Sequence, residues 1–96
     1  MEDYFFNAVG RGLSDLVYRK YGGVKVSIMG DKENTFVRTI VYDAPSHIIN
    51  ELEDNDKKER VVFEVDYDIT DVDFNIEISV FKKLNAIMSD LEVKLQ

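Results

Sequence analysis

The sequence predicts an α+β protein: a mainly antiparallel sheet of three or four strands, with N-terminal and C-terminal helices packed on one face. The prediction rests first on central segments in which apolar and polar residues alternate, the period of a strand with one buried face. It rests also on apolar residues that recur every three or four positions near both ends, which is typical of amphipathic helices. All these apolar faces need cover, and a two-layer packing supplies it.

The chain of 96 residues is expected to form a single compact acidic domain over residues 1–96. Its apolar fraction of 45% is that of an ordinary folded protein, so the formal charge of −7 does not indicate a disordered acidic tail. The single proline and the lack of a Ser-rich or Gly-rich linker agree with one unit.

The first helix is predicted over Tyr4–Tyr21. Its apolar stripe consists of Phe5, Val9, Leu13, Leu16 and Val17. Gly10 and Gly12 weaken the helix by about 1 kcal/mol each relative to alanine. Either the helix bends or breaks there, or a neighbouring backbone approaches so closely that only glycine fits. Gly22 and Gly23 are expected to end it.

Two strands are predicted next, over Val24–Met29 and Thr35–Tyr42, joined by a polar five-residue loop. The second strand carries apolar residues on both faces, which favours a central position in the sheet.

The segment Asp43–Lys58 leaves two alternatives. It is either a short helix or irregular crossing, with Asp43 as cap and Pro45 near the first position, or an extension of the sheet with residues 53–58 as a hairpin tip. We favour the first, in which the inward residues are Ile48, Ile49 and Leu52. In both cases residues 53–58 are expected to be exposed and mobile, because they include no apolar side chain.

An acidic hairpin is predicted over Val61–Val80, followed by a helix over Lys82–Leu95. Alternation is unbroken from Asp71 to Val80, and isoleucine and valine favour strands, so we prefer a fourth strand over 72–80. The alternative is that the last helix begins near Asp73, because its apolar stripe also continues backwards at helical spacing.

Negative charge is concentrated in one part of the chain. Residues 43–81 hold twelve Asp or Glu against three Lys or Arg, a net charge of −9, whereas the segments on either side are each +1. The wet face of the predicted hairpin carries Glu64, Asp66, Asp68, Asp71, Asp73 and Glu77. Three further acids, Glu53, Asp54 and Asp56, flank this set.

Several kinds of chemistry are not expected. The chain has no cysteine, no P-loop, HExxH or GxSxG motif, and no paired carboxylates in a recognisable cleft pattern, so we expect no enzyme activity, no catalytic residue and no cofactor. The acids from Asp66 onward partly match a calcium loop, but Asp71 stands where the loop needs glycine, so no metal site is expected.

Charge and hydropathy limit the classes of partner and the location that we expect for the protein. A pI near 4.6 disfavours direct binding to nucleic acid or anionic lipid. No window is long and apolar enough for a membrane span, and the first residues lack the features of a signal peptide, so a cytoplasmic protein is expected.

The leading hypothesis is a small acidic protein-binding module whose carboxylates stand in for phosphates. It would occupy the basic groove of a nucleic-acid-binding protein. In size, acidity and α+β make-up the chain is similar to the DNA-mimic inhibitors that bacteriophages use against host nucleases, restriction systems and nucleoid proteins; this is a likeness of class, not of motif.

The alternative is a structural or assembly subunit in which the acids only keep the chain soluble. Tyr4, Phe5 and Phe6 cannot all face one core from a single helical turn. Tyr4 or Phe6 is therefore the expected contact for self-association, with a homodimer as the commonest outcome.

Overall fold

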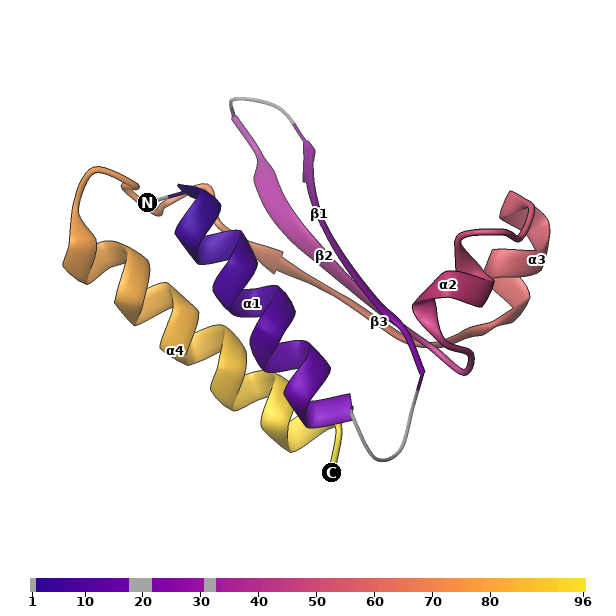
Figure 1. Ribbon diagram of the computed structural model, residues 1–96. Helices are drawn as coiled ribbons and strands as arrows, with labels where there is room; N and C mark the ends of the chain where they lie inside the picture. The colour runs from indigo at the N-terminus through magenta and orange to yellow at the C-terminus, as the bar shows by residue number, and fades with distance from the viewer. Residues whose placement is uncertain (1, 18–21, 31–32) are drawn as a thin grey trace.

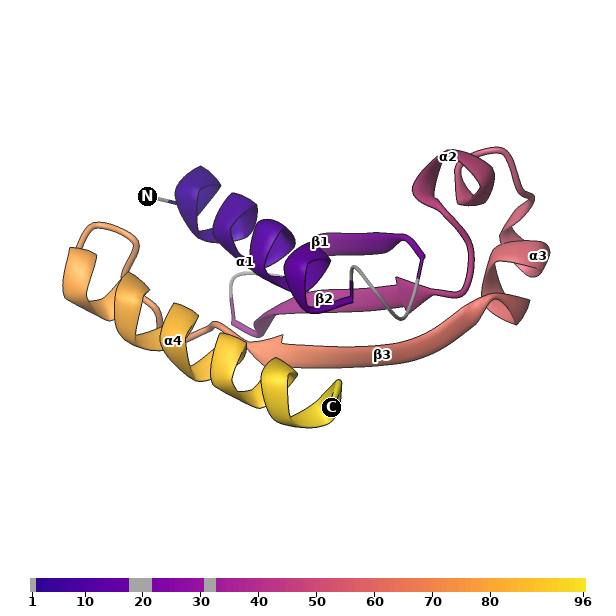
Figure 2. The ribbon, with the colours of Figure 1, turned by 60° about the horizontal axis from the view of Figure 1, so that its bottom comes forward.

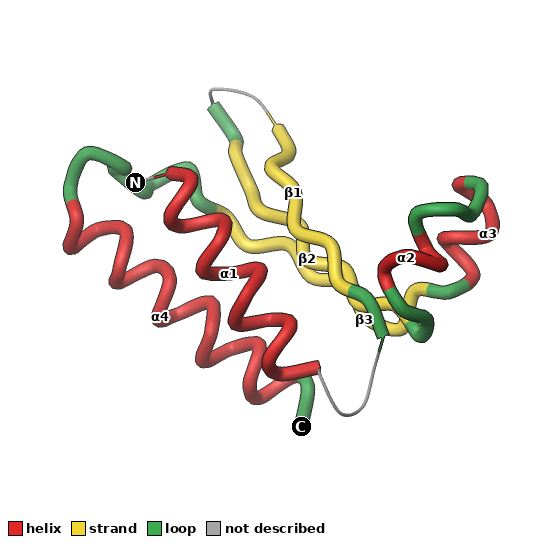
Figure 3. Tube along the Cα trace, viewed as in Figure 1, coloured by secondary structure: helices red, strands yellow, loops and turns green. Residues whose placement is uncertain are grey.

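The computed structural model describes residues 2–17, 22–30 and 33–96, and its class is α+β as predicted. The elements follow one another as α1 (Glu2–Val17), β1 (Val24–Gly30), β2 (Thr35–Tyr42), α2 (Ser46–Ile49), α3 (Asp54–Glu59), β3 (Val61–Asp68) and α4 (Glu77–Lys94) (Figures 1 and 3). The predicted end of the first helix at 18–21, and residues 31 and 32 of the predicted loop, lie outside the described residues.

The sheet is antiparallel, with the described strands in the order β1-β2-β3. The segment predicted to be central is β2, which pairs with β1 from Val24↔Val41 to Gly30↔Thr35. On its other side, β2 pairs with β3 from Phe36↔Asp68 onward. Alternation along β2 buries Val37, Thr39 and Val41 beneath the helices.

Helices α1 and α4 lie side by side against one face of the sheet (Figure 2). The side chains buried between these layers are Phe5, Val9, Leu13, Val17, Val37, Val41, Ile69, Val80, Ile87, Leu91 and Leu95. Gly12 lies in the α1–α4 contact, where an added Cβ would run into the end of the Met88 side chain. The close neighbour of this glycine is therefore the end of a flexible side chain and not the backbone that was expected there.

The predicted fourth strand over Val72–Val80 is wrong. Residues 69–76 form turns, and α4 begins at Glu77. Val72 and Phe74 do pack against the core, and the Phe74 ring lies 5.6 Å from that of Phe5 in an edge-to-face contact. The turn therefore shows the alternation of apolar and polar residues that is typical of a strand, although it pairs with no described strand. From Val80 onward the apolar stripe at helical spacing is buried against α1 and the sheet, which favours helix over strand.

A smaller cluster lies at the far end of the sheet. Tyr42, Ala44 and Ile49 are buried together, with Ile40, Leu52 and Val61 packed against them. A bulge makes this possible: Val41 pairs with Phe63 and Tyr42 pairs with Val61, so Val62 is an extra residue that turns Val61 away from the main core.

For residues 43–58, the structure agrees in part with the favoured alternative. A short helix does form, α2, but Pro45 is its N-cap residue and Asp43 pairs with Arg60 at 3.5 Å instead of capping. Ile49 and Leu52 face inward as expected, whereas Ile48 is 40% exposed. Residues 54–59 are exposed for the most part, and they form α3 instead of a hairpin tip.

Candidate functional site

The outer face of β3 carries three of the predicted acids in a row. Exposure alternates strictly along this strand, so Glu64, Asp66 and Asp68 are exposed while the odd-numbered residues between them pack beneath the helices. Carboxylates two residues apart on a strand are separated by about 6.6 Å along its axis. This row, Glu64, Asp66 and Asp68, is called the acidic row below.

Arg38 of the central strand lies against the acidic row. Its Nε is 2.9 Å from an Asp66 carboxylate oxygen and 3.0 Å from one of Glu64, and its Nη2 donates to the other Asp66 oxygen at 3.1 Å. The hydrogen bond to Asp66 raises the pKa of Arg38 above its ordinary value. Arg38 reduces the net charge of the row from −3 to −2 and holds two of its carboxylates in place.

Sequence reasoning did not single out Arg38. The available signal was a lone cation among apolar residues in the strand predicted to be central. The Arg38↔Asp66 register that brings it to the acids could not be read from the sequence, because it depends on where β3 starts to pair.

Asp68 ends the row and has a different environment. Its carboxylate accepts a hydrogen bond from the Thr70 backbone N–H at 2.9 Å. Hydrogen bonding from Thr70 lowers the pKa of Asp68 below its usual value. The Thr70 hydroxyl also donates to the Thr35 carbonyl at 3.1 Å, which ties the end of β3 to the start of β2.

Asp71, Asp73 and Glu77 do not share this face, contrary to the prediction, because the strand that was to carry them does not exist. Asp71 is in the turn after β3 and pairs with Lys83 of α4 at 3.4 Å. The Asp73 carboxylate accepts the Asn75 backbone N–H at 2.9 Å and so shapes the turn, while Glu77 opens α4. These acids extend beyond the end of the row instead of lying beside it.

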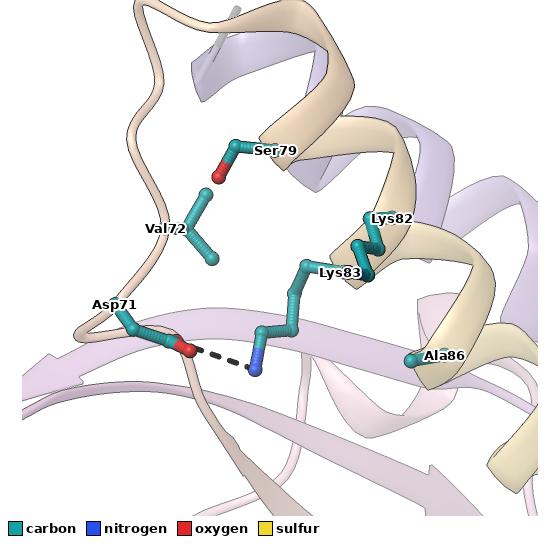
Figure 4. Close-up of a pocket in the computed structure, with 6 residues that line it drawn as sticks. All are labelled: Asp71, Val72, Ser79, Lys82, Lys83 and Ala86. Carbon is teal, nitrogen blue, oxygen red and sulfur yellow. Dashed lines mark ion pairs between the residues drawn. The ribbon is translucent and has the colours of Figure 1, made fainter.

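An open groove of about 290 Å³ lies between this turn and α4 (Figure 4). It is lined by Asp71, Val72, Ser79, Lys82, Lys83 and Ala86. Lys83 reaches across the groove to Asp71, so its ammonium is already paired. The Ser79 hydroxyl accepts the Asp73 backbone N–H at 3.1 Å.

Glu53, Asp54 and Asp56 lie at the opposite end of the sheet from the β3–α4 turn (Figure 1). Glu53 is the N-cap residue of α3 without a side-chain cap bond, and Asp54 and Asp56 are in its first turn. Negative side chains are favourable near a helix N-terminus, which gives these acids a local structural role as well. The nine predicted acids thus form three groups along the molecule.

The two aromatics predicted for self-association differ in exposure. Tyr4 is 44% exposed, and its ring contacts Phe81 edge-to-face at 5.7 Å between centroids. Phe6 is half-buried between Phe5 and Phe74, with centroids 5.2 Å and 6.5 Å away. Self-association stays a prediction, and Tyr4 is the more available of the two.

Within the described part of the chain, no group of three or more acidic or histidine side chains is arranged to hold a metal ion. None of the described helices has both the length and the hydropathy to cross a membrane. Comparison of the chain with protein-family models, curated protein sequences and solved structures finds no match.

Proposed function

We propose that this protein is a non-enzymatic binding module that captures a basic protein partner through the acidic row on β3. The single observation that carries the proposal is the placement of Glu64, Asp66 and Asp68 on one exposed face of one strand. A strand backed by a helix-covered core presents charges at fixed positions, so a partner does not bear the entropic cost of ordering them.

The partner class we propose is a nucleic-acid-binding protein. Carboxylates about 6.6 Å apart form a regular row of negative charge, as the phosphates of a nucleic-acid strand do, where one phosphate occurs per roughly 3.4 Å of axis. The acids of the β3–α4 turn and of α3 would extend the negative surface beyond both ends of the row. Such a surface steers a basic partner and should do so less as salt rises, since exposed charges are screened beyond about 8 Å at physiological ionic strength.

The test compares two variants with the same change in net charge. The first is Glu64→Gln with Asp66→Asn and Asp68→Asn, which removes the row but keeps the side-chain shapes. The matched control is Glu2→Gln with Asp15→Asn and Glu92→Gln, three exposed acids on α1 and α4. Partners are recovered from the source organism by affinity capture and titrated with each variant.

We expect the row variant to bind at least about tenfold more weakly in low salt, and the control to bind like the wild type. We also expect duplex DNA to compete with the wild type for the recovered partner. Equal binding by both variants, or a partner without a basic nucleic-acid site, would contradict the proposal.

A further inference from the structure

One edge of the sheet has no strand beside it in the described part of the chain. Strand β3 is last in the order β1-β2-β3 and pairs only with β2 among the described residues. An edge strand presents backbone N–H and C=O groups that can pair with another extended chain. The acidic row is on this strand.

The register shows which backbone groups face the open edge. The Ile69 backbone N–H donates to the Thr35 carbonyl at 2.9 Å, so Ile69 points its backbone groups toward β2. In an antiparallel pair this direction alternates, so Tyr67 and Val65 also point toward β2. The Val65 carbonyl accepts a hydrogen bond from the Thr39 hydroxyl at 3.0 Å, which is consistent with Val65 pointing its backbone groups toward β2. The outward backbone groups are therefore those of Glu64, Asp66 and Asp68.

The same three residues thus supply the exposed carboxylates and the unpaired edge. We propose that β3 receives an extended segment of the basic partner as an added strand, with Lys or Arg at alternate positions on the outer face. The proposal rests on the proposed function for the charge of the partner, but the mode of binding comes from the edge itself. Recognition by strand addition takes its affinity from the backbone and its specificity from alternate side chains.

Charge decides between a basic segment and a second copy of this chain. Side chains directly opposite on paired strands lie about 5 Å apart, and like charges there are destabilising. Two copies joined through β3 would place their acidic rows against each other. A basic segment would instead place its cations beside carboxylates that already have Arg38 on their other side, so each shared carboxylate would have a cation on both sides.

The experiment uses the full chain and a capped peptide of alternating lysine and threonine. The matched control peptide has the same sequence, with N-methyl groups on the backbone amides of one edge and unmethylated amides on the other. Both peptides carry the same charge, but the methylated edge cannot donate hydrogen bonds. The methylated amides are those of the lysines, because in an antiparallel added strand the lysine amides face β3 when the lysine side chains face the acidic row. Isotope-labelled protein is titrated with each peptide.

We expect the unmodified peptide to shift the amide signals of Glu64, Asp66 and Asp68 and to bind about tenfold more tightly than the methylated one, since several backbone hydrogen bonds depend on those amides. On the protein side, Glu64→Pro removes an outward donor and Glu64→Ala keeps it. We expect Glu64→Pro to bind the unmodified peptide more weakly than Glu64→Ala, with spectra confirming that both are folded.

Equal binding of the two peptides would overturn strand addition while leaving capture by charge intact. Binding of neither peptide in low salt would overturn strand addition and contradict the proposed function as well.

Discussion

Substitution of Gly12 by alanine should change from nearly neutral to favourable for stability when Met88 is shortened. Two terms oppose each other. Alanine is favoured over glycine inside a helix by about 1 kcal/mol. Its Cβ would, however, meet the flexible end of the Met88 side chain across the α1–α4 contact, and moving that half-buried end aside costs about 1 kcal/mol. We therefore expect Gly12→Ala alone to leave the free energy of unfolding nearly unchanged.

Met88→Ala removes the atoms that the new Cβ would meet. This change alone should cost about 2 kcal/mol, because Met88 is half-buried against the core. In that background, Gly12→Ala should recover about 1 kcal/mol, since only the helix preference remains. The coupling between the two positions is then about 1 kcal/mol, above the usual error of additivity.

The measurement is urea unfolding of the four proteins, followed by circular dichroism, with the slopes compared to confirm that the transition is the same. The reasoning would be refuted if Gly12→Ala stabilised the wild type and the Met88→Ala protein equally. In that case the Met88 side chain would make room for the added Cβ at no measurable cost.

Two further predictions concern buried polar contacts. Thr39 is fully buried and its hydroxyl bonds the Val65 carbonyl, so Thr39→Val should lower the free energy of unfolding by about 1 kcal/mol in urea titrations, and a gain in stability would contradict the role of this bond. Burial and then the 2.6 Å hydrogen bond to Asp90 raise the pKa of Tyr67, so the unfolded state loses this proton first and stability should fall as pH rises above about 10. Tyr67→Phe should make that alkaline fall shallower between about pH 10 and about pH 12 in urea midpoints. Burial also raises the pKa of Tyr42, so part of the fall should remain, and an unchanged slope would show that Tyr67 is not its source.

Strands and helices with one buried face could be predicted because the signal for them, the spacing of apolar residues, lies within the segment itself. The apolar segment predicted as a strand over Thr35–Tyr42 matches β2 at both ends, and the alternating segment beginning near residue 61 matches β3. The helical stripes from Phe5 and from Leu84 also identify α1 and α4. In each case the residues that must be buried repeat with the period of the element.

The connection between β3 and α4 could not be predicted in this way. Val72 and Phe74 are drawn to the core from a turn, while Ile78, which continues the alternation, is 75% exposed on α4. Nothing in the alternation itself distinguishes this case from a strand. The same error placed Asp71, Asp73 and Glu77 on the sheet, so only the strand residues Glu64, Asp66 and Asp68 lie where they were predicted, while their role in binding stays a prediction.

The extra residue at Val62 divides the interior of the protein into two parts. Because it turns Val61 to the opposite side of the sheet from Phe63, the described residues packed around Tyr42 and Ile49 form a cluster separate from the one beneath α1 and α4. The separate cluster has far fewer buried residues, so we expect the α2–α3 end to open more readily than the main core. Such opening would let the start of β3 adjust to a bound chain at little cost to the rest of the protein.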